Sequence, residues 1–156
     1  MEPVQYHFLI NPAAGKGGAP KLIPDITACM TGKGLPFFIH TTTAPGDAEQ
    51  YVRAVCEKGL PARFYVCGGD GTLNEAVNGA AFCPHAAVGV IPLGSGNDFI
   101  RNFDKPALFR DILAQTEGDS VSIDLLSVNG RYAVNMVNIG FDCEAVMQVD
   151  RFRQYP

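Results

Sequence analysis

Short apolar runs alternate with stretches of helical periodicity along most of the chain, and this alternation limits the fold more than any other feature. Strands are expected at residues 4–10, 36–40, 62–67 and 86–91. Between them, apolar residues recur three and four positions apart, as on one face of an amphipathic helix. A short later helix is expected over residues 108–113. This β-α-β-α order predicts an α/β fold, with a parallel sheet and helices on both faces.

The pattern changes after Gly118, where apolar residues begin to alternate with polar or small ones. Asn129-Gly130 separates two such runs, residues 121–125 and 132–136. Asn-Gly at this place predicts a β-hairpin, because both turn residues tolerate a positive φ. A hairpin after a parallel sheet indicates a second structural unit. The expected division of the chain is therefore into residues 1–119 and 120–156.

Composition narrows the class of protein. Of the 156 residues, 47% are hydrophobic and 18% are charged, which is typical of a globular domain. The net charge of −4 argues against a nucleic-acid partner, because nucleic acids favour a clustered basic surface. The five cysteines are scattered and odd in number, so reduced thiols are expected rather than disulfides or a zinc site.

The sequence shows no signal for secretion or for a membrane span. The first residues lack the basic segment and apolar run of a signal peptide. The apolar stretches fall far short of the roughly 18 residues that a transmembrane helix needs. A cytoplasmic location is therefore expected.

The sharpest local pattern joins an expected strand to an expected helix and reads Cys67-Gly68-Gly69-Asp70-Gly71-Thr72-Leu73-Asn74-Glu75. Its glycines let the backbone approach a ligand, and the free N–H groups of a helix start suit an anion such as phosphate. A carboxylate at Asp70 would repel phosphate unless it orients the loop or acts through a magnesium ion. Thr72 and Glu75 also have the spacing of a capping box, which would explain both without a ligand. Both interpretations stay open on these residues alone.

Two further loops follow expected strands and contain groups that suit phosphate. Residues 11–17 include Lys16, which can meet a phosphate or simply be solvated. Residues 91–99 offer the Ser95 hydroxyl between two glycines. The alternative for this loop is structural, with Asn97 or Asp98 as the N-cap of a helix.

A fourth loop, residues 41–48, follows the second expected strand. It runs from three threonines to Asp47, which is expected to cap the next helix. Because the strands of a parallel sheet end at one edge, the four loops are expected to lie together along that edge. Ligands of open α/β sheets bind there.

Together, these segments resemble the catalytic domain of diacylglycerol kinases, sphingosine kinases and bacterial lipid kinases. Gly-Gly-Asp-Gly alone is shared with NAD kinases, whereas its extension Thr72-Leu73-Asn74-Glu75 is similar to lipid kinases. The resemblance covers nearly the whole chain in matching order: Asn11-Pro12-x-x-Gly15, Gly46-Asp47-Ala48, residues 68–75, Pro92-Leu93-Gly94-Ser95-Gly96-Asn97-Asp98-Phe99, Asp124 and residues 135–142.

This resemblance implies a Rossmann-like nucleotide-binding domain followed by a β-rich domain, with the active site between the two. It implies a magnesium network supported by Asp98 and Asp124, and a role for Asp70 in orienting the site or coordinating the metal. Ser95 stands where many relatives have threonine, and it keeps the hydroxyl. The implied ATP-binding residues are Asn11, Gly15, Thr42, Gly68, Gly69, Asp70, Gly71, Thr72, Asn74, Glu75, Gly94 and Ser95.

The resemblance also implies parts that this chain lacks. Family members have roughly twice this length, at about 100–200 residues per domain. Their general base and most of their lipid pocket follow the matched region, so residues 120–156 are expected to begin a truncated C-terminal β-rich domain. The expected partners are ATP, a lipid alcohol at the membrane surface and the missing domain. A face left open by that domain can also lead to a homodimer.

The leading hypothesis is the ATP-binding domain of a lipid kinase, which transfers the γ-phosphate of ATP to the hydroxyl of diacylglycerol or a related lipid. Without the base, this chain alone is expected to bind nucleotide and to show little kinase activity. The alternatives are an NAD kinase-like enzyme, a non-catalytic regulatory domain that binds nucleotide, and an interaction module without a ligand.

Overall fold

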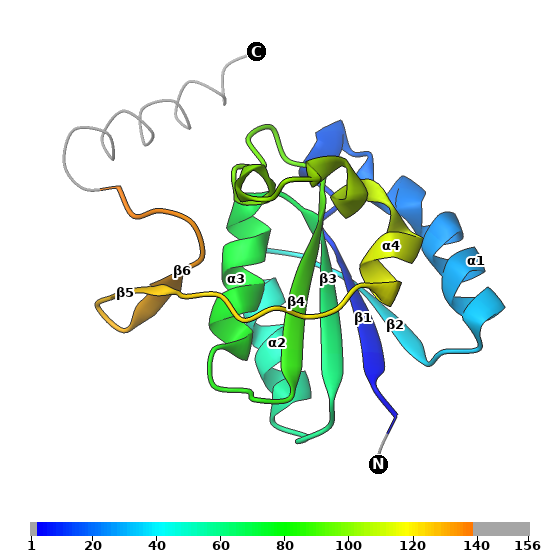
Figure 1. Ribbon diagram of the computed structural model, residues 1–156, viewed down its shortest axis with the longest axis horizontal. Coiled ribbons are helices and arrows are strands. Elements are labelled where there is room, and N and C mark those ends of the chain that lie inside the picture. Colours follow the sequence, from blue (N-terminus) through cyan, green and yellow to red (C-terminus); the bar gives the residue numbers. More distant parts are fainter. Residues whose placement is uncertain (1–2, 139–156) are drawn as a thin grey trace.

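A parallel sheet of four strands forms the centre of the protein, as the sequence predicts (Figure 1). The computed structural model describes residues 3–138. The strand order is β2-β1-β3-β4, so β2 and β4 are the edges. All four strands run in one direction, and their C-terminal ends lie at one edge of the sheet. Their bounds are Gln5–Ile10 (β1), Phe37–Thr41 (β2), Ala62–Gly68 (β3) and Ala86–Pro92 (β4).

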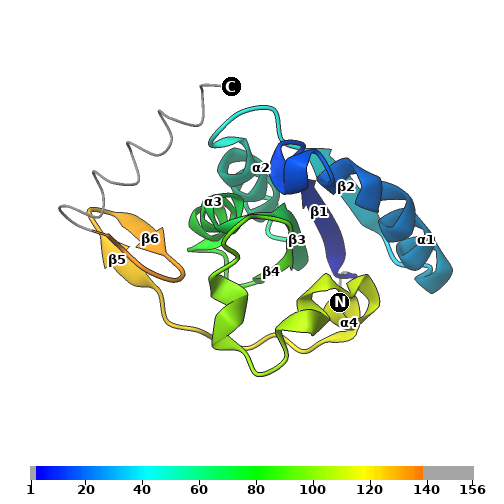
Figure 2. The same ribbon diagram turned by 90° about the horizontal axis from the view of Figure 1, so that it is seen from above.

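Helices cover both faces of this sheet (Figure 2). One face packs against α2 (Asp47–Cys56) and α3 (Asp70–Ala80), and the other against α1 (Ile23–Lys33) and α4 (Ile112–Glu117). The two cores follow from the alternation of side chains along the strands. On β3, Phe64 and Val66 face the first core, whereas Tyr65 and Cys67 face the second.

Short 3₁₀ helices occupy the connections: η1 (Ala14–Lys16), η2 (Ala19–Leu22), η3 (Phe99–Asn102) and η4 (Pro106–Arg110). The single helix expected over residues 108–113 is wrong, because η4 and α4 are separate elements. Asp111 lies between them in an extended conformation. Its carboxylate accepts a hydrogen bond from the backbone N–H of Ala114 at 3.0 Å, so it caps α4 and ends η4.

The predicted hairpin is present and consists of β5 (Leu126–Val128) and β6 (Arg131–Ala133). Asn129 and Gly130 form its turn with φ values of 50° and 75°. The strand expected from residue 121 is wrong, because β5 begins at Leu126. Val121 is 70% and Ile123 is 47% exposed, so most of the apolar alternation before β5 has no buried face that would hold it in a strand.

Three other expectations can be placed on this architecture. The four cysteines within the described residues are free, and Cys143 lies outside them. No helix in the described part of the chain is long and apolar enough to cross a membrane. Residues 139–156 of the expected C-terminal domain lie outside the described residues.

Candidate functional site

A cleft of about 630 Å³ opens where β1, β3 and β4 end. Three of the four loops singled out in the sequence meet there, each contributing backbone and small side chains. The lining residues are Asn11, Ala13, Ala14, Gly15, Lys16, Gly69, Gly71, Thr72, Leu93, Gly94 and Ser95. Seven of the predicted ATP-binding residues are among these: Asn11, Gly15, Gly69, Gly71, Thr72, Gly94 and Ser95.

Asn11 joins the loop after β1 to helix α3. Its Nδ2 donates to the hydroxyl oxygen of Thr72 at 2.8 Å, and its Oδ1 accepts from the backbone N–H of Ala13 at 3.0 Å. The capping-box interpretation is therefore wrong. Helix α3 already begins at Asp70, its N-cap position is Gly69 and no side chain caps it.

Asp70 joins the loop after β3 to the loop after β4. Its Oδ2 accepts from the backbone N–H of Asp98 at 3.1 Å, and its Oδ1 accepts from that of Phe99 at 3.2 Å. Both carboxylate oxygens are thus engaged in holding the neighbouring loop. This geometry agrees with the loop-orienting interpretation of Asp70.

The N-cap interpretation of the loop after β4 is wrong in its details. Asp98 occupies the N-cap position of η3, but its side chain caps nothing and pairs with Arg101 at 2.9 Å. Asn97 has a left-handed φ of 53° and donates through Nδ2 to the carbonyl of Gly94 at 2.6 Å. Asn97 therefore closes the turn that presents Ser95 at the cleft.

The loop after β3 and the loop after β4 approach each other closely at two glycines, Gly69 and Gly94. An added Cβ at Gly94 would lie 2.7 Å from the Cα of Gly69, and one at Gly69 would lie 3.1 Å from the Cα of Gly94. These contacts are with backbone, which cannot move aside as a flexible side chain can. The two loops can meet only because neither residue carries a side chain.

The loop after β2 does not line the cleft. Thr42 is buried, and its backbone N–H donates to the carbonyl of Ile10 at 2.9 Å. The expectation that Asp47 is the N-cap of α2 is wrong, because Asp47 is the first residue of this helix. Gly46 takes the cap position with a φ of 85°, a left-handed conformation that glycine adopts without strain.

The Asp47 carboxylate instead holds its own turn together. Its oxygens accept from the Thr43 backbone N–H at 2.7 Å, the Thr43 hydroxyl at 2.8 Å and the His40 Nε2 at 2.9 Å. These hydrogen bonds, that of the Thr43 N–H above all, hold the pKa of Asp47 below its usual value. The Asp47 carboxylate is therefore engaged within its own turn.

The other predicted site residues lie behind or away from the cleft. Gly68 is buried at the end of β3, and Asn74 accepts through its backbone carbonyl from Asn78. Glu75 is partly buried, one turn into α3, and Asp124 is exposed before β5. Within residues 3–138, no three His, Cys, Asp or Glu side chains are close enough together to hold a metal ion.

Lys16 lines the cleft. From the sequence alone, this lysine can either meet a phosphate or be solvated. Among the lining residues within the described part of the chain, it is the only charged side chain. It has a positive φ of 53° between two glycines that also have positive φ. Its place in the Gly15-Lys16-Gly17 turn puts a cation among the residues that line the cleft.

The cleft is suited to an anion. The first intrahelical bond of α3 runs from the Leu73 N–H to the Gly69 carbonyl, so the N–H groups of Gly71 and Thr72 precede it at the positive end of the helix dipole. Both residues line the cleft, as Lys16 does. Backbone N–H groups at a helix start together with a lysine form a site that binds phosphate groups.

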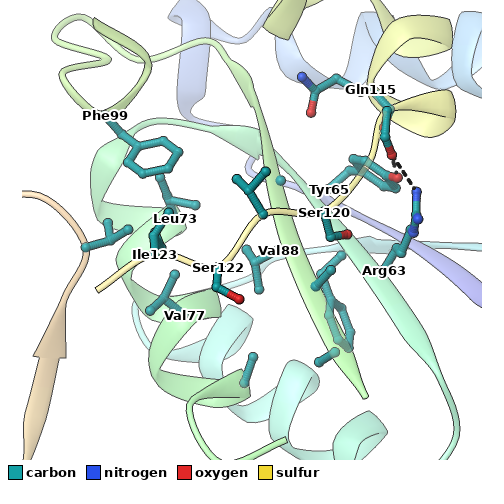
Figure 3. A pocket seen from close by; sticks show the side chains of 18 of the residues that line it. Arg63, Tyr65, Leu73, Val77, Val88, Phe99, Gln115, Ser120, Ser122 and Ile123 are labelled. Atoms are coloured by element: carbon teal, nitrogen blue, oxygen red, sulfur yellow. Dashed lines mark hydrogen bonds between the residues drawn. The ribbon is translucent and has the colours of Figure 1, made fainter. Parts of the chain in front are cut away.

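A larger cavity, of about 790 Å³, lies between β4, α3 and residues 118–125 (Figure 3). Its lining is mostly apolar and includes Leu73, Val77, Val88 and Phe99. None of the predicted site residues lines it, and it has no residue in common with the cleft. Size alone would favour this cavity, but the backbone N–H groups and the lysine that suit a phosphate line the smaller cleft.

Comparison with known proteins points to one family. A sequence model described as the diacylglycerol kinase catalytic domain matches residues 5–128. A diacylglycerol kinase of Staphylococcus carnosus is 34% identical over 131 residues, which cover 83% of this chain and 42% of the relative. A protein of Serratia proteamaculans named probable lipid kinase YegS-like is 33% identical over 144 residues, covering 89% of this chain and 46% of the relative.

Solved structures agree with this result. A crystal structure described as a diacylglycerol kinase from Bacillus anthracis has a TM-score of 0.70 and 25% identity, and covers 95% of this chain and 52% of that chain. A second structure from that organism has a TM-score of 0.68 and 28% identity, over 84% of this chain and 47% of that chain. The present chain therefore spans about half the length of the relatives it matches.

Proposed function

The chain belongs to the diacylglycerol kinase catalytic domain family, and from this premise we propose that it is the ATP-binding part of a lipid kinase. The observation that carries the proposal is the cleft formed by the Asn11, Gly69 and Gly94 loops. It combines backbone N–H groups at the start of α3 with a single lysine. This combination suits a chain of phosphates better than it suits a neutral ligand.

In this proposal, the chain's residues bind and orient the triphosphate. The N–H groups of Gly71 and Thr72 would contact phosphate oxygens, and Lys16 would offset their charge. Asp70 would keep the loop after β4 in place through its bonds to Asp98 and Phe99. Phosphoryl transfer depends mainly on such positioning and on charge neutralisation.

Magnesium would accompany ATP and offset the charge of the transferring phosphate. An added Cβ at Gly96 would lie 3.3 Å from an oxygen of Asp70 and 3.3 Å from an oxygen of Asp98, so these two carboxylates flank one glycine. Mg²⁺ usually takes one or two carboxylates together with phosphate oxygens and water. Asp70 and Asp98 fit that donor set, and Asp124 is assigned a supporting role on family resemblance alone.

The acceptor in this proposal is the hydroxyl of diacylglycerol or a related lipid, met at a membrane surface. Among the cleft-lining residues there is no carboxylate or histidine that could take the proton of that hydroxyl. We therefore propose that the 156-residue chain binds ATP but does not phosphorylate lipid by itself.

Calorimetry and a turnover assay test the proposal together. The purified chain should bind ATP with Mg²⁺. Its melting temperature should rise on binding, because a ligand that binds only the folded state stabilises that state. Asp70→Ala, which frees the loop after β4, should weaken that binding. Failure of millimolar ATP to raise the melting temperature would refute nucleotide binding.

The turnover arm separates the alternatives. The chain is incubated with ATP and Mg²⁺, and with either diacylglycerol in mixed micelles or NAD. The proposal expects no phosphate transfer to either acceptor. Rapid transfer to diacylglycerol would contradict the assignment of the base outside this chain, and transfer to NAD would favour the NAD kinase alternative.

A further inference from the structure

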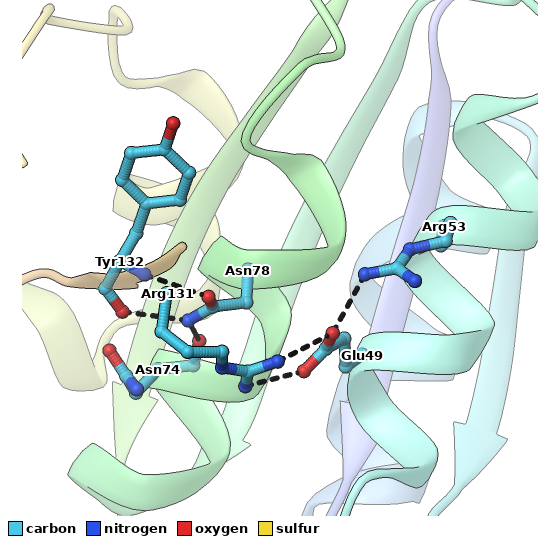
Figure 4. A network of polar contacts seen from close by, with 6 residues as sticks. All are labelled: Glu49, Arg53, Asn74, Asn78, Arg131 and Tyr132. Atoms are coloured by element: carbon cyan, nitrogen blue, oxygen red, sulfur yellow. Dashed lines mark hydrogen bonds and ion pairs between the residues drawn. The ribbon is translucent and has the colours of Figure 1, made fainter. Parts of the chain in front are cut away.

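The β5–β6 hairpin is held on helix α3 by one asparagine (Figure 4). The Asn78 side chain donates to the Tyr132 carbonyl at 2.8 Å and accepts from the Tyr132 N–H at 2.9 Å. Its Nδ2 also donates to the carbonyl of Asn74 at 2.8 Å. Asn78 is only 8% exposed, so these bonds are shielded from water and fix the position of β6 on the helix.

Glu49 holds the neighbouring residue of the hairpin on helix α2. Its two carboxylate oxygens accept from the Arg131 guanidinium at 3.0 and 2.7 Å, a bidentate pair, and Arg53 of the same helix donates to it at 2.7 Å. The Glu49 side chain is 13% exposed. The hydrogen bonds from Arg131 are the main reason that the pKa of Glu49 is lowered. Bidentate pairs of this kind also fix geometry.

A third contact continues the series along the chain. Asn102 of η3 donates through Nδ2 to the Asn135 side-chain oxygen at 3.2 Å. Residues 131, 132 and 135 are thus held by α2, α3 and η3 in turn. These three elements are the first helices after β2, β3 and β4.

Asp70 connects two of these contacts to the cleft. It is the first residue of α3, and eight residues of that helix, about 12 Å, separate it from Asn78. Its carboxylate also accepts the N–H of Phe99, the first residue of η3, which carries Asn102. Two short series of contacts, through α3 and through η3, therefore connect the Asp70 loop to the hairpin.

We infer that Asn78 and Glu49 are positioning residues that couple the docking of the β5–β6 hairpin to the nucleotide cleft. The inference rests on the proposed nucleotide binding and concerns its regulation. When the Asp70 loop is ordered by nucleotide, the hairpin is held more firmly. By reciprocity, release of the hairpin weakens nucleotide binding by the factor by which nucleotide tightens the docking of the hairpin.

Hydrogen exchange at the Tyr132 amide measures the docking directly, because this N–H is bonded to Asn78. The amide of Val66, in the buried strand β3, serves as the internal reference for global unfolding. The test variant is Arg131→Gln, and the matched control is Arg53→Gln. Both remove one arginine partner of Glu49, but only Arg131 belongs to the hairpin.

Arg131→Gln should speed exchange at Tyr132 at least about fivefold relative to Val66, given a bidentate pair at the upper end of the range for surface ion pairs. It should also weaken ATP binding at least about threefold. Arg53→Gln should change neither. In the chain without nucleotide, Asp70→Asn should speed exchange at Tyr132 and leave Val66 unchanged.

The outcomes separate this inference from the proposed function. If ATP does not bind the unaltered chain, the proposed function fails, and the Asp70→Asn exchange experiment still tests the route to the hairpin. If ATP binds equally well to Arg131→Gln while Tyr132 exchanges faster, the hairpin contacts are purely structural and the coupling is refuted. Unchanged exchange at Tyr132 in both Arg131→Gln and Asp70→Asn would refute the positioning role itself.

Discussion

Replacing Gly71 by alanine should make the protein more stable and a poorer nucleotide binder. Gly71 is the second residue of α3 and lines the cleft. A Cβ added there meets no protein atom within 4 Å, so the methyl group occupies open space beside the cleft. The substitution thus changes the space available to a ligand without straining the protein.

The two effects have different magnitudes. Glycine to alanine at a compatible helical position stabilises by about 0.4–1 kcal/mol, mainly by restricting the unfolded chain. In a chain of this size, that corresponds to a rise in melting temperature of about 1–4 °C. A lost hydrogen bond between a backbone N–H and a charged phosphate costs about 1.5–3 kcal/mol. ATP affinity should therefore fall about 10- to 150-fold.

Differential scanning fluorimetry gives the melting temperature, and calorimetric titration gives the ATP affinity. Gly32→Ala on α1 is the matched control, because its added Cβ also meets nothing within 4 Å and Gly32 does not line the cleft. It should give a similar stabilisation and leave ATP affinity unchanged. If Gly71→Ala binds ATP as tightly as the unaltered chain, phosphate does not approach the start of α3, and the reasoning about this helix is refuted.

Three further substitutions or conditions test the fold around the site. Burial lowers the pKa of His7 from 6.5 to about 4, so His7 takes up a proton when the protein unfolds between these pH values. The free energy of unfolding should therefore fall by up to about 1.4 kcal/mol per pH unit as the pH drops from 6.5 towards 4. In urea titrations, His7→Gln should flatten this pH dependence. Gly79→Ala should lower the melting temperature, because its Cβ would lie 2.6 Å from the Glu49 carbonyl oxygen and 2.9 Å from the Val52 Cβ. The cost of this overpacking, about 1–3 kcal/mol, outweighs the gain in helix propensity. Asp47→Asn should destabilise the protein by about 1–2 kcal/mol at neutral pH. It should also reduce the stability lost below about pH 4, because a carboxylate with a lowered pKa contributes stability that disappears as the pH falls through that pKa. Acid titration followed by circular dichroism measures both effects.

The sheet and its loops could be predicted because their cause is local in the sequence. Apolar runs on β1, β3 and β4 are buried on both faces of the sheet, and such strands give continuous hydrophobic segments. The position of the cleft then follows from parallel strand direction. The register of the hairpin turn also follows from Asn129-Gly130 alone.

The details of the site depend on contacts that no local pattern shows. Thr72 has the spacing of a capping residue, but its hydroxyl is bonded to Asn11, which lies 61 positions away. Asp47 is a residue type that often forms an N-cap, but its carboxylate accepts hydrogen bonds from His40 and Thr43 instead. In both cases two hydrogen-bonding arrangements suit the same residue type. A long-range contact decides between them for Thr72, and partners within the same turn decide for Asp47.

Asp70 shows how the same competition produces a binding site. A free carboxylate at the start of α3 would oppose a phosphate there, because like charges repel. In this protein both oxygens of Asp70 accept N–H groups of the loop after β4, so the negative charge is directed at Asp98 and Phe99. The N–H groups of Gly71 and Thr72, one and two residues further along the helix, line the cleft. The residue that looks least suited to an anion site is therefore the one that holds its two walls together.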